Sequence, residues 1–152
     1  MMYINLFLAA ILAGICAWSD AKTMKIPNQY TYPFAVIGLI LCLTNGQYDK
    51  LFNALTVFVV YLLLMSFSMG GGDLKLATAL ALFLGAEPVL YGTLIASVVM
   101  CLYGITKTFY ATGQISAVVG VLMGRVPAGA VPFGALMGPA SVLCAGLLFF
   151  RS

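Results

Sequence analysis

The chain has 152 residues, of which 63% are hydrophobic and 7% are charged, against roughly one-quarter charged in an average soluble domain. This composition excludes an ordinary soluble domain and predicts a single integral-membrane domain over residues 1–152. The net charge of +3 is not gathered into a basic stripe, so we expect no nucleic-acid partner. The chain has no histidine, which removes the most common metal ligand and the usual general base, and we expect no metal or cofactor.

Apolar stretches long enough, or nearly long enough, to cross about 30 Å of hydrocarbon follow one another along the chain. The expected spans are Tyr3–Trp18, Tyr30–Thr44, Leu51–Met69, Leu74–Ala86, Val89–Thr106 and Phe133–Phe150. Turn residues at Asn45-Gly46, Gly70–Gly72 and Glu87-Pro88 predict the breaks between them. The first span lacks the basic start and the small-residue cleavage site of a secretory signal, so we expect it to be retained. The predicted fold is an all-α membrane protein, a bundle of about six transmembrane helices.

Basic residues are distributed unevenly over the connecting segments of a six-span chain. One side would carry Lys22, Lys25, Lys75, Lys107 and Arg125, and the other Lys50 and Arg151. The positive-inside rule then predicts both termini outside and segments 20–29, 70–75 and 107–132 at the cytoplasmic face. The polar content of residues 108–124 and their three glycines favour a short amphipathic or re-entrant segment over a further span. A seventh span would move Arg151 to the inside.

The four acidic residues divide into two kinds. Asp49 and Glu87 lie in short connectors, where solvated loop charges are common. Asp20 and Asp73 are 53 positions apart, but each lies at the cytoplasmic end of a predicted span. The 13-residue span Leu74–Ala86 reaches only about 20 Å, so we expect Asp73 to lie below the cytoplasmic surface.

Each of these two aspartates also has a simpler interpretation. Asp73 suits the N-cap of a helix, and Asp20 suits a solvated position beside Lys22 and Lys25. An N-cap does not explain the three glycines Gly70–Gly72, which predict an irregular backbone that a peptide substrate could approach closely.

Taken as a pair, Asp20 and Asp73 predict acid–base chemistry. Two carboxyls facing each other in a partly dry pocket do not easily ionise together. The ionised one can take a proton from water, and the protonated one can give a proton to a scissile carbonyl oxygen or a leaving amine. The pattern therefore favours peptide hydrolysis, and it leaves open a proton-linked transporter or channel that uses the same carboxylates, or a noncatalytic assembly scaffold.

Three motifs resemble those of a known family. "GGGDLKL", residues 70–76, resembles the G-x-G-D signature of the GxGD intramembrane aspartyl proteases. "DAKTMKIPN", residues 20–28, resembles the segment of type IV prepilin peptidases in which an aspartate ends the first helix six residues before Ile-Pro-Asn. "VPFG", residues 131–134, is similar to the [IV]-P-[FY]-G that opens their last helix. The three motifs come in the right order, so the resemblance is specific and covers essentially the whole chain.

This resemblance implies that Asp20 and Asp73 form the catalytic pair of a peptidase in the plasma (inner) membrane of a bacterium or archaeon. The substrates would be prepilins or pseudopilins, which lose a short basic leader at the cytoplasmic face, and membrane lipid would surround the protein. The segment of residues 19–29 is too short to contain the cytoplasmic insertion that the methyltransferase members of the family carry. The chain is therefore most similar to the short form associated with tight-adherence (Flp-type) pili, and we expect no N-methyltransferase activity. The oligomeric state stays open.

Further residues are expected to bind substrate or to shape the site. They are Gly70, Gly71, Gly72, Lys75, Pro27, Asn28, Pro132 and Gly134. Pro27-Asn28 would form the turn after Asp20, and Pro132–Gly134 would bend the chain into the last helix. Lys75 would steer an acidic substrate side chain or tune Asp73, or would simply be a positive-inside anchor.

Overall fold

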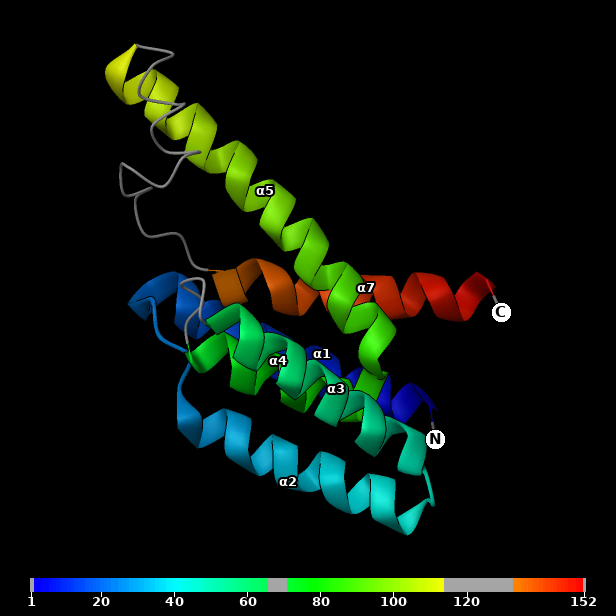
Figure 1. Cartoon of the computed structure of the whole chain (residues 1–152). Helices are drawn as coiled ribbons and strands as arrows, with labels where there is room; N and C mark the ends of the chain where they lie inside the picture. The colour runs from blue at the N-terminus through cyan, green and yellow to red at the C-terminus, as the bar shows by residue number, and fades with distance from the viewer. Residues whose placement is uncertain (1, 66–70, 114–132, 152) are drawn as a thin grey trace.

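The computed structural model describes residues 2–65, 71–113 and 133–151, and all regular structure within these ranges is α-helical (Figure 1). The helices are α1 (Met2–Thr23), α2 (Asn28–Thr44), α3 (Tyr48–Met65), α4 (Gly71–Leu84), α5 (Ala86–Thr112) and α7 (Phe133–Arg151). The described ranges contain no strand, which confirms the predicted all-α class for them. The start of α1 and the end of α7 lie at the same end of the bundle (Figure 1).

Helix α4 forms the centre of the bundle and contacts each of the other five described helices. Figure 1 shows it between α7 and α2. Its buried side chains cover all sides of the helix, as expected when every face meets protein. They are Leu74, Leu76, Ala77, Ala79, Leu80, Ala81, Leu82 and Phe83. With 14 residues, α4 is about 21 Å long, as short as its sequence predicts.

The break between α4 and α5 lies at Gly85, so the turn predicted at Glu87-Pro88 is wrong. Gly85 has φ +92°, a backbone conformation that residues with a side chain rarely adopt. It is the single residue between the two helices. Glu87 and Pro88 belong to the first turn of α5. An acidic residue suits the positive end of the helix macrodipole, and proline is tolerated there because the first N–H groups have no intrahelical acceptor. The predicted turn at Asn45-Gly46 is confirmed, with Gly46 at φ +64°.

Helix α5 is longer than the expected span Val89–Thr106. It runs for 27 residues, about 40 Å, and stops where Gly113 adopts the left-handed conformation. Its C-terminal half projects away from the bundle (Figure 1). The segment expected at 108–124 therefore begins as a continuation of α5, and residues 114–124 lie outside the described residues. The predicted end of this helix at Thr106 is too early, because no residue before Gly113 breaks the helix.

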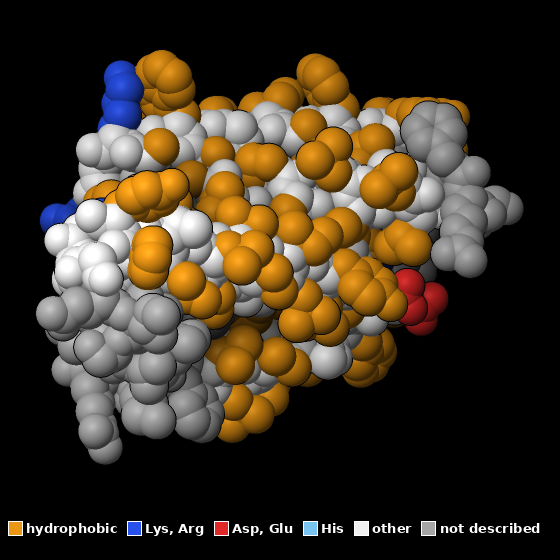
Figure 2. Space-filling view, turned by 90° about the horizontal axis from the view of Figure 1, so that it is seen from above, with side chains coloured by type: hydrophobic (Ala, Val, Ile, Leu, Met, Phe, Trp, Pro, Cys, Tyr) orange, Lys and Arg blue, Asp and Glu red, His pale blue; other side chains and the backbone are white. Residues whose placement is uncertain are grey.

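The outer surface of the bundle is largely apolar. Leu63 on α3, Leu94 on α5 and Leu147 on α7 are each more than 60% exposed. Figure 2 shows one face covered mainly by hydrophobic side chains, with Lys and Arg at one end and Asp and Glu at the other. Among the described helices, Tyr3–Thr23 and Ala86–Thr112 are long and apolar enough to cross a membrane by length and composition. Such an extended apolar surface is typical of contact with lipid.

Helices α5 and α7 approach each other closely at Gly92. A Cβ atom built on Gly92 would lie 2.6 Å from the backbone nitrogen of Ser141 and 2.7 Å from its Cα. We therefore expect Gly92→Ala to force the two helices apart and to destabilise the fold by about 3 kcal/mol or more, because backbone atoms cannot rotate away. Thermal unfolding in detergent measures the loss, with Gly14→Ala as control, since a Cβ there meets nothing within 4 Å. Equal melting temperatures for the two variants would contradict this prediction.

Candidate active site

Asp20 lies in the last turn of α1, because this helix continues to Thr23 and does not end at Trp18 as expected. Its side chain is 6% exposed, so it is not the solvated juxtamembrane charge of the simpler interpretation. The backbone N–H of Ala135, in the first turn of α7, donates a hydrogen bond to Asp20 Oδ2 at 3.0 Å. First-turn N–H groups have no acceptor within their own helix, and the macrodipole there favours a negative partner. The start of α7 therefore holds the Asp20 carboxylate in place.

Asp73 is the third residue of α4 and is half-buried. The helix already begins at Gly71, so Asp73 lies within the first turn and not at the N-cap position of the simpler interpretation. The expectation of an irregular glycine segment is also wrong for Gly71 and Gly72, which are helical. A Cβ on Gly72 would lie 3.1 Å from Cβ of Ile26, so this glycine admits the Ile26 side chain against the helix. Gly70 lies outside the described residues.

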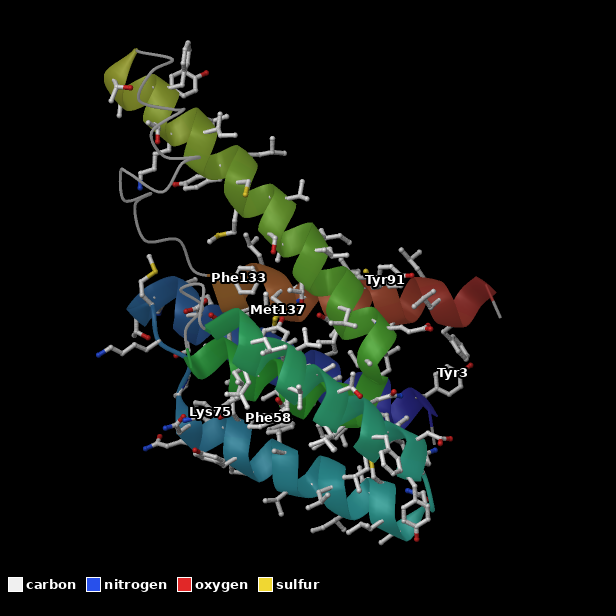
Figure 3. The ribbon with its side chains drawn as sticks, in the orientation of Figure 1. Tyr3, Phe58, Lys75, Tyr91, Phe133 and Met137 are labelled. Atoms are coloured by element: carbon white, nitrogen blue, oxygen red, sulfur yellow. The ribbon has the colours of Figure 1, made fainter. Side chains whose placement is uncertain are left out.

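The two aspartates converge on Gly134, the second residue of α7. A Cβ built on Gly134 would lie 3.1 Å from Asp20 Oδ2 and 3.2 Å from Asp73 Oδ1. The two carboxyl oxygens are therefore separated by no more than about twice this distance, although they come from α1 and α4. In Figure 3, the label on the neighbouring Phe133 marks this end of α7. The absence of a side chain at Gly134 leaves the space between the carboxyl groups open.

Ile26 completes this arrangement and was missed as a site residue from sequence. Its Cδ1 atom would lie 2.6 Å from a Cβ on Gly134, while its Cβ lies against Gly72. The side chain therefore packs between the starts of α4 and α7, beside both carboxyl groups. The signal available in the sequence was its position in the Ile-Pro-Asn segment.

A buried tyrosine was missed as well. Tyr61 on α3 is fully buried, and its hydroxyl contacts Thr93 Oγ1 on α5 and Met137 Sδ on α7. The Thr93 hydroxyl also reaches the carbonyl of Val89 at 2.7 Å, so Tyr61 and Thr93 join α3, α5 and α7 in one buried network. A hydroxyl inside the third apolar run was the only sequence signal for this network.

Lys75 points toward the start of α2 (Figure 3). Its ammonium donates to Asn28 Oδ1 at 3.0 Å and lies 5.1 Å from the ring centre of Tyr32. Pro27 is the N-cap residue of α2, with extended backbone angles, and so fixes where that helix starts. The hydrogen bond from Lys75 to Asn28 therefore joins α4 to α2, two residues after Asp73 in the chain. Pro132 lies outside the described residues.

The chemistry available at this site is that of two carboxyl groups. Across the described part of the chain, no three or more His, Cys, Asp or Glu side chains gather in a way that could hold a metal ion. Two carboxylates without further ligands make a poor cation site. The two groups can instead share and transfer protons, as required for general acid–base catalysis.

The fold and this site define an all-helical protein with a carboxylate pair where three helix ends meet. The sequence model of the type IV leader peptidase family matches residues 6–105, and the chain belongs to this family. The matched region includes Asp20 and Asp73 and stops before Gly134.

Curated relatives include two archaeal proteins and one bacterial protein. Prepilin peptidase EppA of Methanocaldococcus jannaschii is 39% identical over 84 residues, which are 53% of this chain and 23% of that protein. Prepilin leader peptidase/N-methyltransferase of Vibrio cholerae is 32% identical over 91 residues, 53% of this chain and 36% of the relative. Prepilin peptidase EppA of Methanothermobacter thermautotrophicus is 32% identical over 99 residues, which are 57% of this chain and 25% of that protein. The matches thus span only about a quarter to a third of these relatives, and no solved structure matches significantly.

Proposed function

We propose that this protein is an aspartyl endopeptidase that removes the short basic leader from type IV prepilins or pseudopilins. The observation that carries the proposal is the convergence of Asp20 and Asp73 on Gly134 in a member of the type IV leader peptidase family. The names of the curated relatives support a prepilin as the substrate class.

In this proposal the two carboxyl groups share one proton. The ionised carboxylate takes a proton from a water molecule, whose oxygen attacks the carbonyl carbon of the scissile peptide bond. The protonated carboxyl gives its proton to the carbonyl oxygen, and the amine leaves with a proton as the tetrahedral intermediate collapses. The burial of Asp20 supports this sharing, because a dry environment disfavours two adjacent negative charges.

We further propose a multi-pass orientation in the plasma membrane, with six spans, both termini outside and the aspartates at the cytoplasmic face. Lys22, Lys25 and Lys75 lie near the aspartates in the chain, as expected for a cytoplasmic end. The aspartates lie at the ends of α1 and α4, not at mid-helix, so a leader joined to an apolar helix would present its cleavage site there without a deep entry path.

Methylation of the new amino terminus is not part of this proposal. Helices α1 and α2 are joined by only four residues, 24–27, which leaves no room there for a cytoplasmic insertion. The released subunit should therefore carry a free, unmethylated amine.

Coexpression with a candidate prepilin tests the proposal. We expect the pilin to shift to higher mobility on a gel, and mass spectrometry should give the mass of the subunit without its leader and without a methyl group. Cells carrying the empty vector provide the baseline. An unprocessed pilin, together with proton flux in vesicles reconstituted with this protein, would favour a transporter instead. An unprocessed pilin without flux would favour a scaffold.

A further inference from the structure

We propose that a cavity at the end of the bundle opposite Asp20 and Asp73 binds the headgroup phosphate of a membrane phospholipid, with Lys50 as its main partner. The cavity has a volume of about 390 Å³. Ligand sites typically measure about 300–1,000 Å³. Residues of α1, α3, α4, α5 and α7 line the cavity. This inference goes beyond the proposed peptidase function and does not depend on the carboxylate pair.

The position of the cavity matches the depth of lipid headgroups. Asp73 lies in the first turn of α4, whereas Phe83, in the last turn of the same helix, lines the cavity. The helix rises by about 15 Å between these two residues. Tyr3 also lines the cavity and lies at the other end of the bundle from Lys75 (Figure 3). Tyr3 and Tyr48, at the starts of α1 and α3, are both exposed, and tyrosine is enriched at membrane–water interfaces.

Lys50, in the first turn of α3, brings a positive charge to one wall of the cavity. Its side chain is half-buried, and its ammonium donates a hydrogen bond to the carbonyl of Phe83 at 3.0 Å. This carbonyl is one of the last four of α4, which have no donor within the helix, and the negative end of the macrodipole attracts the ammonium. Within the described part of the chain, Lys50 forms no ion pair and no other hydrogen bond. An ammonium has three N–H donors, so two remain for a bound group.

Asn53 adds a second donor to the same wall. It stands three residues after Lys50, so the two side chains lie on one face of α3. Its amide nitrogen would lie 3.7 Å from a Cβ added to Gly85, and its side chain forms no hydrogen bond to another described residue. A charged and a neutral donor on successive turns suit the oxygens of a phosphate. Glu87 lines the cavity as well, but it is exposed, so water and salt screen its charge more than that of the half-buried Lys50.

The remaining walls are largely apolar, which favours a lipid over free phosphate. They include Tyr3 and Leu6 of α1 and Leu148 and Phe149 of α7. The rings of Tyr3 and Phe149 meet edge to face, with their centres 5.4 Å apart. Tyr3 and Leu148 are also exposed, so this side of the cavity borders the apolar outer surface of the bundle. A phosphate at Lys50 would thus be joined to acyl chains along α1 and α7, and basic pockets between membrane helices are known to hold lipid headgroups.

Thermal unfolding of the purified full-length protein in detergent tests the proposal. Phosphatidylglycerol is the probe, and diacylglycerol with the same chains and inorganic phosphate are the reference compounds. We expect phosphatidylglycerol to raise the melting temperature in a saturable way, because a molecule that binds only the folded state stabilises it. Diacylglycerol lacks the phosphate and inorganic phosphate lacks the chains, so each should shift the melting temperature far less.

Two variants assign the effect to the cavity. Lys50→Met keeps a long unbranched side chain without the ammonium, and it should raise the apparent dissociation constant of phosphatidylglycerol at least about tenfold. Asn53→Ala leaves the bond from Lys50 to Phe83 in place and should raise this constant about threefold. Each constant is derived from shifts relative to the same variant without lipid, so lower stability alone does not mimic the loss. Lys107→Met, the same change at an exposed position in the C-terminal half of α5, is the matched control and should bind like the parent.

Three results would overturn the proposal. An unchanged dissociation constant in Lys50→Met would mean that Lys50 only caps the end of α4. A shift of equal size with diacylglycerol would mean that acyl chains suffice without a phosphate. The full shift with inorganic phosphate would reveal a simple anion site and exclude the lipid. The peptidase function would stand after any of these results, because the cavity and the carboxylate pair lie at opposite ends of α4.

Discussion

Asp20→Asn and Asp73→Asn are each expected to abolish leader removal while the protein still accumulates in the membrane. Asparagine keeps an oxygen that can accept the Ala135 N–H, so the junction of α1 and α7 should persist in Asp20→Asn. The amide cannot take a proton from water or donate one as a carboxyl does. General acid–base catalysis contributes about 10²–10⁴-fold, so we expect at least this loss in kcat/KM. Cleavage of a coexpressed prepilin, read on a gel, provides the measurement.

Two other acidic residues supply matched controls for this experiment. Asp49 and Glu87 are exposed in the first turns of α3 and α5, and Asp49→Asn and Glu87→Gln should process the pilin like the parent. The double variant of Asp20 and Asp73 should be no worse than either single one, because groups that act as a unit are not additive. Parental cleavage by either single variant would refute the carboxylate pair.

Gly134→Ala is expected to lower kcat/KM by about 10²-fold. The added methyl group would lie 3.1 Å and 3.2 Å from the two carboxyl oxygens, in the space a reacting water or carbonyl needs, and 2.6 Å from Ile26 Cδ1. A displacement of about 1 Å in a catalytic arrangement can cost this factor. Gly146→Ala makes the same change in the same helix where a Cβ meets nothing within 4 Å, and it should behave like the parent.

Combining Gly134→Ala with Ile26→Val separates the two contacts of the added methyl group. Loss of Cδ1 removes the steric conflict with Ile26, so the melting temperature should return toward that of the parent. The methyl group would still occupy the space between the carboxyl groups, and activity should stay low. Recovery of activity together with stability would mean that Gly134→Ala acts by distorting the fold and not by filling the site.

The positions of the helices were largely predictable from sequence. Apolar runs and the Asn45-Gly46 turn located the six described helices, and the length of the fourth run predicted a short α4. Helix ends were less predictable, because they depend on backbone conformations that composition does not determine. Gly85 and Gly113 adopt positive φ and end α4 and α5, whereas Gly71 and Gly72 are helical.

The sequence by itself determined the chemical groups of this protein: an apolar helical chain without histidine, in which Asp20 and Asp73 stand at the ends of apolar runs. Only the tertiary structure decided that both reach Gly134, that the N–H of Ala135 holds Asp20, and that Ile26 lies beside them. The reason is physical. Helix formation follows from neighbouring residues, but these contacts join segments up to 115 positions apart and exist only when the helices pack closely enough for glycine alone to fit between them.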